Sequence, residues 1–169
     1  MAGFPHIGAY GTLRPWTLDL ADASVAAGIP NGAYWANAQR IITPGGVLCS
    51  KLSFGVNTQS GNMALALYAD NGANVPGTLI AQTGSFAVPV GGNTIATVSL
   101  GGSYQISNGM WIALTCDNVT AEWLCGGQPA GVIFPTWRTC QWNNGSLVFA
   151  SNPASISPAN RLFAIWGEL

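Results

Sequence analysis

The chain has 169 residues, enough for one domain with a single sizeable hydrophobic core, and its formal net charge is −1. Charged residues make up 7% of the sequence, against about 25% in an ordinary globular protein, and the five Lys and Arg residues are too scattered to form a phosphate-binding patch. No apolar run reaches the roughly 18 residues of a membrane-spanning helix, so the composition excludes both nucleic acid and a membrane as expected partners.

The low charge also bears on the folded surface. Hydrophobic residues make up 49% of the sequence, and contiguous apolar surface tends to mark an interface. We therefore expect copies of the chain, or another protein, to cover part of this surface. A homo-oligomer held by apolar contacts is the expected form, because few charges are available for salt bridges.

Residues 1–35 mix glycine, proline and aromatic residues without a sustained period, apart from a short helical turn expected within residues 17–28. A basic region followed by an apolar stretch, the mark of a secretory signal, is missing. We interpret this segment as an extended N-terminal assembly arm that reaches a neighbour, with folding back over its own sheet as the alternative. Its expected anchors are bulky side chains at intervals: Phe4, Tyr10, Leu13, Trp16 and Leu18.

In residues 36–169, short β-prone runs alternate with glycine, proline and asparagine. The expected strands cover residues 40–56, 62–69, 78–88, 93–100, 109–116, 121–125, 146–150 and 161–167. Short strands with turn residues between them, and no helical pattern, predict an all-β fold. We expect a single antiparallel β-sandwich, jelly-roll-like, that follows the arm.

Alternating apolar residues give these strands a buried face. The side chains expected there are Leu52, Phe54, Val56, Met63, Leu65 and Leu67. Ile95 is ambiguous, because it shares its side of the strand with Thr97 and Ser99. Trp111 and Trp166 lie within strand runs and are expected to pack in the core or between sheets.

One hairpin carries a recognisable pattern. The string "SGNMALALYADNGANVPGTLIAQTG", residues 60–84, is followed by "ISNGMWIALTC", residues 106–116. An apolar strand ends in Tyr-x-Asp, a loop contains glycine, Pro-Gly-Thr-Leu opens the next strand, and a glycine later precedes a strand led by an aromatic residue. In this pattern the chain resembles a β-sandwich module of bacteriophage virion proteins and some bacterial surface proteins. The resemblance covers residues 40–116, and "RLFAIWGEL" resembles the closing strand.

The resemblance implies a non-enzymatic structural protein of the phage virion, made in the host cytoplasm. A capsid decoration or cement protein is the leading expectation, with a homo-oligomer, preferably a trimer, bound to the major capsid protein or another virion protein. A tail-fibre or receptor-binding protein that recognises a host surface glycan is the alternative. A free carbohydrate-binding module is a further alternative.

Few residues of the sequence could form a catalytic site or a metal site. Asp117 and Glu122 could flank one loop, as the paired carboxylates of glycoside hydrolysis do, but this uncharged sequence favours a protein that is not an enzyme. Asp70, Asn71 and Asn74 supply oxygens in one loop, but calcium takes six to eight ligands and usually several carboxylates. We expect a plain turn there, and no metal or other cofactor.

The four cysteines, Cys49, Cys116, Cys125 and Cys140, do not have zinc-site spacing. We expect buried thiols, with a Cys116 to Cys125 disulfide as the alternative. The sequences Asn118-Val119-Thr120 and Asn144-Gly145-Ser146 match the glycosylation pattern. Because no export signal is expected, we interpret both matches as chance.

Seven tryptophans are unusual in a chain of this size. Several lie in residues 117–145 beside amide and guanidinium groups, where a ring could stack on a sugar, pack in the core or anchor a subunit contact. The candidate contact residues are Trp123, Trp137, Arg138, Gln141, Trp142 and Asn143.

Overall fold

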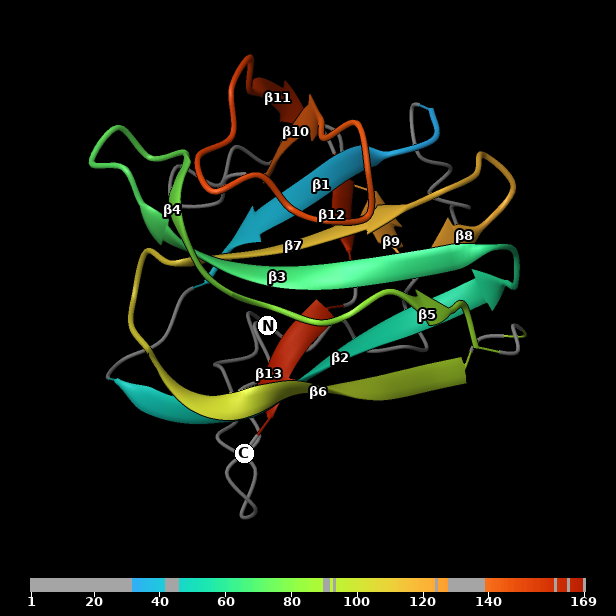
Figure 1. Ribbon diagram of the computed structural model, residues 1–169, viewed down its shortest axis with the longest axis horizontal. Helices are drawn as coiled ribbons and strands as arrows, with labels where there is room; N and C mark the ends of the chain where they lie inside the picture. The colour runs from blue at the N-terminus through green and yellow to red at the C-terminus, as the bar shows by residue number, and fades with distance from the viewer. Residues whose placement is uncertain are drawn as a thin grey trace.

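The computed structural model describes residues 32–41, 46–89, 92, 94–123, 125–127, 139–159, 161–163 and 165–168. Within these ranges every regular element is a β-strand (Figure 1): β1 (Trp35–Arg40), β2 (Val47–Thr58), β3 (Asn62–Asp70), β4 (Pro76–Gln82), β5 (Phe86–Ala87), β6 (Thr94–Ile106), β7 (Trp111–Cys116), β8 (Glu122–Trp123), β9 (Cys125–Gly127), β10 (Thr139–Asn143), β11 (Ser157–Ala159), β12 (Arg161–Phe163) and β13 (Ile165–Glu168). No helix in the described ranges has the length and apolar character needed to cross a membrane.

The strands form two main antiparallel sheets that pack face to face. The larger sheet has the order β11-β10-β1-β7-β3-β4, with β5 paired to β3. The smaller sheet has the order β13-β2-β6, with β8 paired to β2, and β9 and β12 form a separate ribbon. Figure 1 shows β2, β6 and β13 below the larger sheet. The predicted all-β antiparallel sandwich is therefore confirmed.

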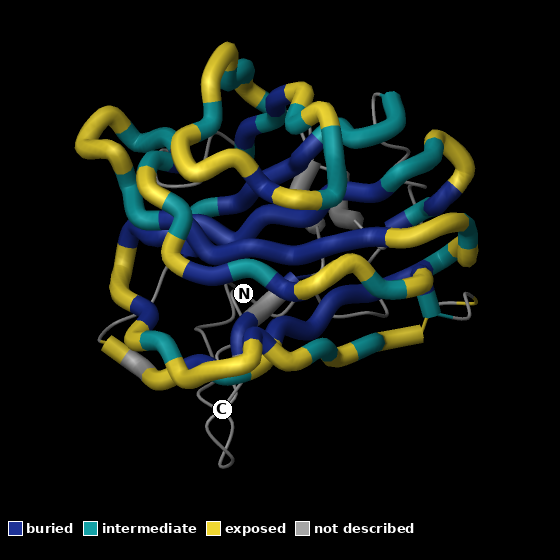
Figure 2. The backbone as a smooth tube through the Cα atoms, in the orientation of Figure 1, coloured by how far each residue is buried: buried dark blue, intermediate teal, exposed yellow. Residues whose placement is uncertain are grey.

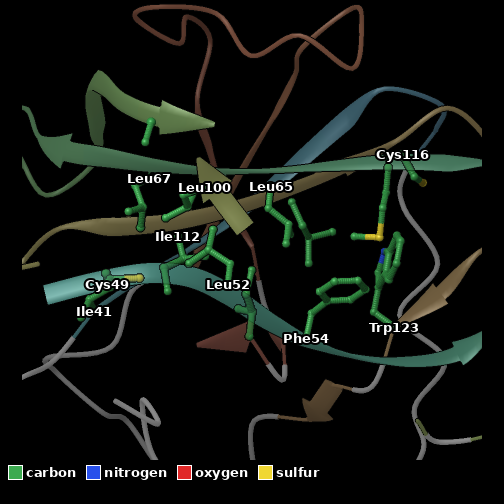
Figure 3. Packing of buried hydrophobic residues seen from close by; sticks show 14 of the residues in the cluster. Ile41, Cys49, Leu52, Phe54, Leu65, Leu67, Leu100, Ile112, Cys116 and Trp123 are labelled. Carbon is green, nitrogen blue, oxygen red and sulfur yellow. The ribbon is translucent and has the colours of Figure 1, made fainter. Parts of the chain in front are cut away.

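The main core lies between these two sheets. Every second side chain of β2 and β3 points into it, as the alternation predicts. Leu52, Phe54, Val56, Met63, Leu65 and Leu67 are each at most 1% exposed. Figure 3 shows Leu65 and Leu67 reaching down from β3 toward Leu52 and Phe54 of β2. Full burial of one such side chain contributes about 1.5–3 kcal/mol, so this layer is a main source of stability.

A second apolar cluster covers the outer face of the larger sheet. Its floor is made of small side chains: Ala36, Ala38, Ala64, Ala66 and Ala113. Small residues let another chain segment come close, and residues 147–156 pack there through Phe149, Leu147 and Ile156. As a result β3 and β7 are buried on both faces, and Figure 2 shows them mainly in dark blue.

Some expected strand positions were wrong. Residues 40–56 do not form one strand, because β1 ends at Arg40 and β2 begins at Val47. Residues 146–150 form no strand, because the chain bends at residues 145–148, where the Asn144 side chain binds two nearby backbone carbonyls. Strand β10 covers Thr139–Asn143, where no strand was expected. The helical turn expected within residues 17–28 lies outside the described residues.

Candidate functional site

The loop of the recognisable hairpin is built around Asp70. Oδ1 of Asp70 accepts the backbone N–H groups of Gly72 at 2.8 Å and Asn74 at 3.3 Å. Oδ2 accepts the indole N–H of Trp111 at 3.0 Å and lies 3.9 Å from Nε of Arg40. Gly72 and Asn74 have φ angles of 87° and 59°, the left-handed conformations that glycine and asparagine adopt most readily.

These contacts favour the ionised form of the Asp70 side chain. Burial opposes ionisation, but the hydrogen bonds from Trp111, Gly72 and Asn74 and the nearby Arg40 charge outweigh it and lower the pKa of the carboxyl group. Both oxygens of the carboxylate are therefore engaged by this chain. These hydrogen bonds close the loop and tie it to a tryptophan of a neighbouring strand.

Asp117 and Glu122, the candidate catalytic pair, hold the turn between β2 and β3 from two sides. Asp117 accepts the backbone and side-chain N–H groups of Asn62, both at 2.9 Å. Glu122 accepts hydrogen bonds from Asn57 at 2.6 Å and Thr58 at 2.5 Å. Burial opposes ionisation of Asp117, but its hydrogen bonds outweigh this and lower its pKa. A general acid in glycoside hydrolysis needs the opposite shift.

Gly61 shows how tightly this turn is held. Its φ angle is 62°, and a β-carbon placed on it would lie 2.0 Å from Nδ2 of Asn118 and 2.1 Å from Oδ1 of Asp117. Those two side chains therefore occupy the space that any other residue would need. The turn between β2 and β3 is therefore fixed by the hydrogen bonds of Asp117 and Glu122 and by the close packing at Gly61.

Both asparagines of the glycosylation pattern are structural. Nδ2 of Asn118 donates to the carbonyl oxygen of Ser60 at 2.8 Å and to Asp117 at 3.0 Å. Nδ2 of Asn144 donates to the carbonyl oxygens of Ser146 at 2.8 Å and Val148 at 3.0 Å. The same pattern that marks a glycosylation acceptor also suits a turn in which asparagine binds the backbone, and these residues are used in that second way.

Two of the six candidate contact residues are core residues instead. Trp123 is 1% exposed and packs edge-on against Phe54, with ring centroids 6.3 Å apart, in the main core. Trp142 is 1% exposed and meets Tyr68 edge-on at 5.8 Å in the outer cluster, beside Phe149. Neither ring can stack on a sugar, so the interpretation as contact residues was wrong for both, and the packing alternative holds.

Of the other four candidates, the structure describes Gln141 and Asn143. Gln141 is half-buried on β10, and Asn143 is exposed, with its Oδ1 accepting the backbone N–H of Gly145 at 3.0 Å. Trp137 and Arg138 lie outside the described residues. The same holds for the expected arm anchors Phe4, Tyr10, Leu13, Trp16 and Leu18.

The cysteines follow the buried-thiol expectation where the structure describes them. Cys116 and Cys140 are free and buried, and the Cys116 thiol contacts the carbonyl oxygen of Asn118 at 3.0 Å. A Cys116 to Cys125 disulfide was therefore the wrong alternative. Burial raises the pKa of Cys140 to about 12, so this thiol is not a nucleophile at neutral pH.

A pocket of about 300 Å³ opens on the outer face of the larger sheet, beside the Asp70 loop. Its lining residues are Asn74, Val75, Trp111, Thr139, Cys140, Ile156, Ser157, Pro158 and Ala159. The two hydroxyl groups are used internally, since Thr139 donates to the carbonyl oxygen of Ala159 and Ser157 to that of Gln141. The pocket is therefore suited to an apolar group more than to a charged substrate.

Sequence reasoning missed the link between Asp70, Trp111 and Arg40. The Tyr-x-Asp ending of β3 and the aromatic start of β7 were noted as separate signals, and their pairing depends on two strands meeting side by side. In the described part of the chain, no three His, Cys, Asp or Glu residues gather as a metal site. No protein-family model matches the chain, and comparisons with curated proteins and with solved structures also give no match.

Proposed function

We propose that this chain is a non-enzymatic structural protein of a bacteriophage particle, a capsid decoration protein that stabilises the shell through protein contacts. The observation that carries the proposal is that the carboxylates form hydrogen bonds within their own chain. Asp70, Asp117 and Glu122 each bind two or more groups of their own chain and fix turns. These bonds support a rigid scaffold: Asp70 fixes the loop of the hairpin that resembles virion modules, and Asp117 and Glu122 fix the turn before it.

The described surface also supports this proposal. Five large apolar side chains are exposed: Leu48, Ile80, Ile95, Val119 and Val148. The most exposed are Val148 at 68% and Leu48 at 56%. A protein with so few charges and such side chains on its surface is expected to bury part of that surface in an assembly.

Immunogold electron microscopy tests the proposal on intact phage particles from the source of the chain. Antibodies raised against the purified chain should label the head, and particles stripped of the chain should lose genome at a lower temperature than complete ones. Adding back the purified chain should restore heat stability. Gold confined to the tail would favour the receptor-binding alternative, and absence of the chain from purified particles would overturn the proposal.

Hydrolytic activity is tested separately with the matched amide variant. Asp117→Asn with Glu122→Gln should weaken the β2–β3 turn, and neither the wild type nor this variant should cleave polysaccharide. Cleavage by the wild type that the variant lacks would contradict the non-enzymatic assignment.

A further inference from the structure

Among the described residues, strand β6 forms one long edge of the smaller sheet. It runs for 13 residues, from Thr94 to Ile106, and contains no charged residue and no proline. In the part of the chain that the structure describes, β6 pairs with β2 alone. Thr94, Ile95, Thr97 and Ser99 are exposed, and Figure 2 shows much of this strand in yellow and teal along the lower side of the molecule.

An edge of this kind usually carries protection against pairing with another chain. Typical devices are a charge, a proline, a very short strand or a covering segment. The edge strand β4 of the larger sheet is covered in this way: the backbone N–H of Leu79 donates to the carbonyl oxygen of Ser151 at 2.9 Å, and Gln82 accepts the backbone N–H of Phe149 at 2.9 Å. Strand β6 has neither charge, proline nor such a cover among the described residues.

The regular part of β6 is residues 94–100. It ends at Gly101, whose φ angle of 76° breaks the extended conformation, and the register with β2 also shifts opposite this region. Along these seven residues the sides alternate. Ala96, Val98 and Leu100 pack against the main core, while Ile95, Thr97 and Ser99 point to the outer face of the smaller sheet.

This segment is complementary to itself when two copies run antiparallel. If Thr97 lies opposite Thr97, then Ile95 lies opposite Ser99, and Ala96 lies opposite Val98. Residues facing the core then meet residues facing the core, so that the two cores become continuous across the junction. A shift of the pairing by one residue would place the core-facing side chains of one copy opposite the outward-facing side chains of the other. With no charge on either strand, no like-charge repulsion opposes the contact.

We propose that β6 is the site where a second copy of this chain binds, by antiparallel pairing of residues 95–99 about a two-fold axis at Thr97. Backbone hydrogen bonds would join the two smaller sheets into one. This inference rests on the proposed function and deepens it, because it names the surface through which copies of the chain meet in an assembly. A two-fold axis makes a dimer, in contrast to the trimer that the resemblance favours.

The test is the oligomeric state of the full chain, measured by light scattering coupled to size exclusion at micromolar concentration. The wild type should be a dimer. Thr97→Lys and Thr97→Glu each place two like charges on the axis and should weaken the dimer by about tenfold or more. Mixed in equal amounts, they should form a heterodimer. Thr78→Lys, at an exposed threonine of the covered strand β4, is the matched control and should leave the dimer intact.

A cysteine variant covers the case in which the charged variants fail to fold. Paired residues at a two-fold axis lie within disulfide range, so Thr97→Cys should give a covalent dimer on mild copper–phenanthroline oxidation. Thr78→Cys and the wild type should not. A wild type that is monomeric or trimeric, an intact dimer in Thr97→Lys, or equal cross-linking at position 78 would overturn the inference.

The outcomes of the two proposals are separable. If labelling places the chain on the phage head but Thr97→Cys does not cross-link, the decoration role stands and the β6 interface is wrong. If the dimer forms but purified particles lack the chain, the interface stands and the decoration role is wrong.

Discussion

Replacing Asp70 by asparagine tests the link between the β3–β4 loop and the outer apolar cluster. In the folded chain Oδ2 of Asp70 accepts the indole N–H of Trp111, while Oδ1 accepts two backbone N–H groups of the loop. Asparagine keeps one oxygen for the backbone groups but turns an amide N–H₂ group toward the indole. Two donors then face each other, and Trp111, at 0% exposure, cannot reach water instead.

The loss follows from these contacts. A buried polar group left without a partner costs about 1–3 kcal/mol. Asp70 also loses its attraction to Arg40, but the two side chains are 21% and 26% exposed and 3.9 Å apart, so this adds less than about 1 kcal/mol. We expect Asp70→Asn to lower the free energy of unfolding by about 1–3 kcal/mol. In a domain of this size each kcal/mol lowers Tm by about 2–4 °C.

Urea denaturation followed by tryptophan fluorescence and circular dichroism measures this loss. Trp111→Phe supplies the second arm of a double-mutant cycle, because it removes the indole donor. In that background Asp70→Asn should cost less, with a coupling energy of about 1 kcal/mol or more. Asn71→Ala, which removes one exposed bond to the backbone of Ala73, is the loop control and should change stability little. Strictly additive losses would refute the role given to the indole bond.

Three further predictions concern the turns. Asn144→Ala removes a side chain that binds four groups of residues 142–150 and should lower the free energy of unfolding by about 1–3 kcal/mol in urea; unchanged stability would contradict this. Because the folded state lowers the pKa of Asp70 and Asp117, their contribution is present above the ordinary carboxyl pKa and is lost as pH falls through the folded-state values. Tm should therefore drop in acid, and a Tm that stays level from neutral pH to pH of about 2 would disprove it. Gly72→Ala, where the added carbon meets open space, should cost about 1–2 kcal/mol from its φ angle alone. Gly61→Ala should cost about 1–3 kcal/mol more, because its added carbon displaces hydrogen-bonded side chains. Equal losses of stability in the two variants would show that the side chains of Asp117 and Asn118 do not hold the β2–β3 turn.

Local patterns determined much of the fold. The alternation of β2 and β3 identified Leu52, Phe54, Leu65 and Leu67 as buried, because the direction of a side chain in a strand depends on its parity and not on distant contacts. A turn is also a local property, because it depends on the φ angles that its own residues can adopt. Glycine before Trp111 predicted a turn, and Gly109 has a φ angle of 94°. The low charge and the absence of helical periodicity were likewise properties of the sequence alone.

Only the tertiary structure decided which residues were available for contact. Trp123 and Trp142 look alike in the sequence, but one is covered by the opposing sheet and the other by residues 147–156, because burial depends on what packs over a ring. Asp117 binds Asn62, 55 residues away, and no local pattern reports such a pair. The place of β6 at the edge of the described sheet is also a tertiary property, because the order of strands depends on contacts between distant segments.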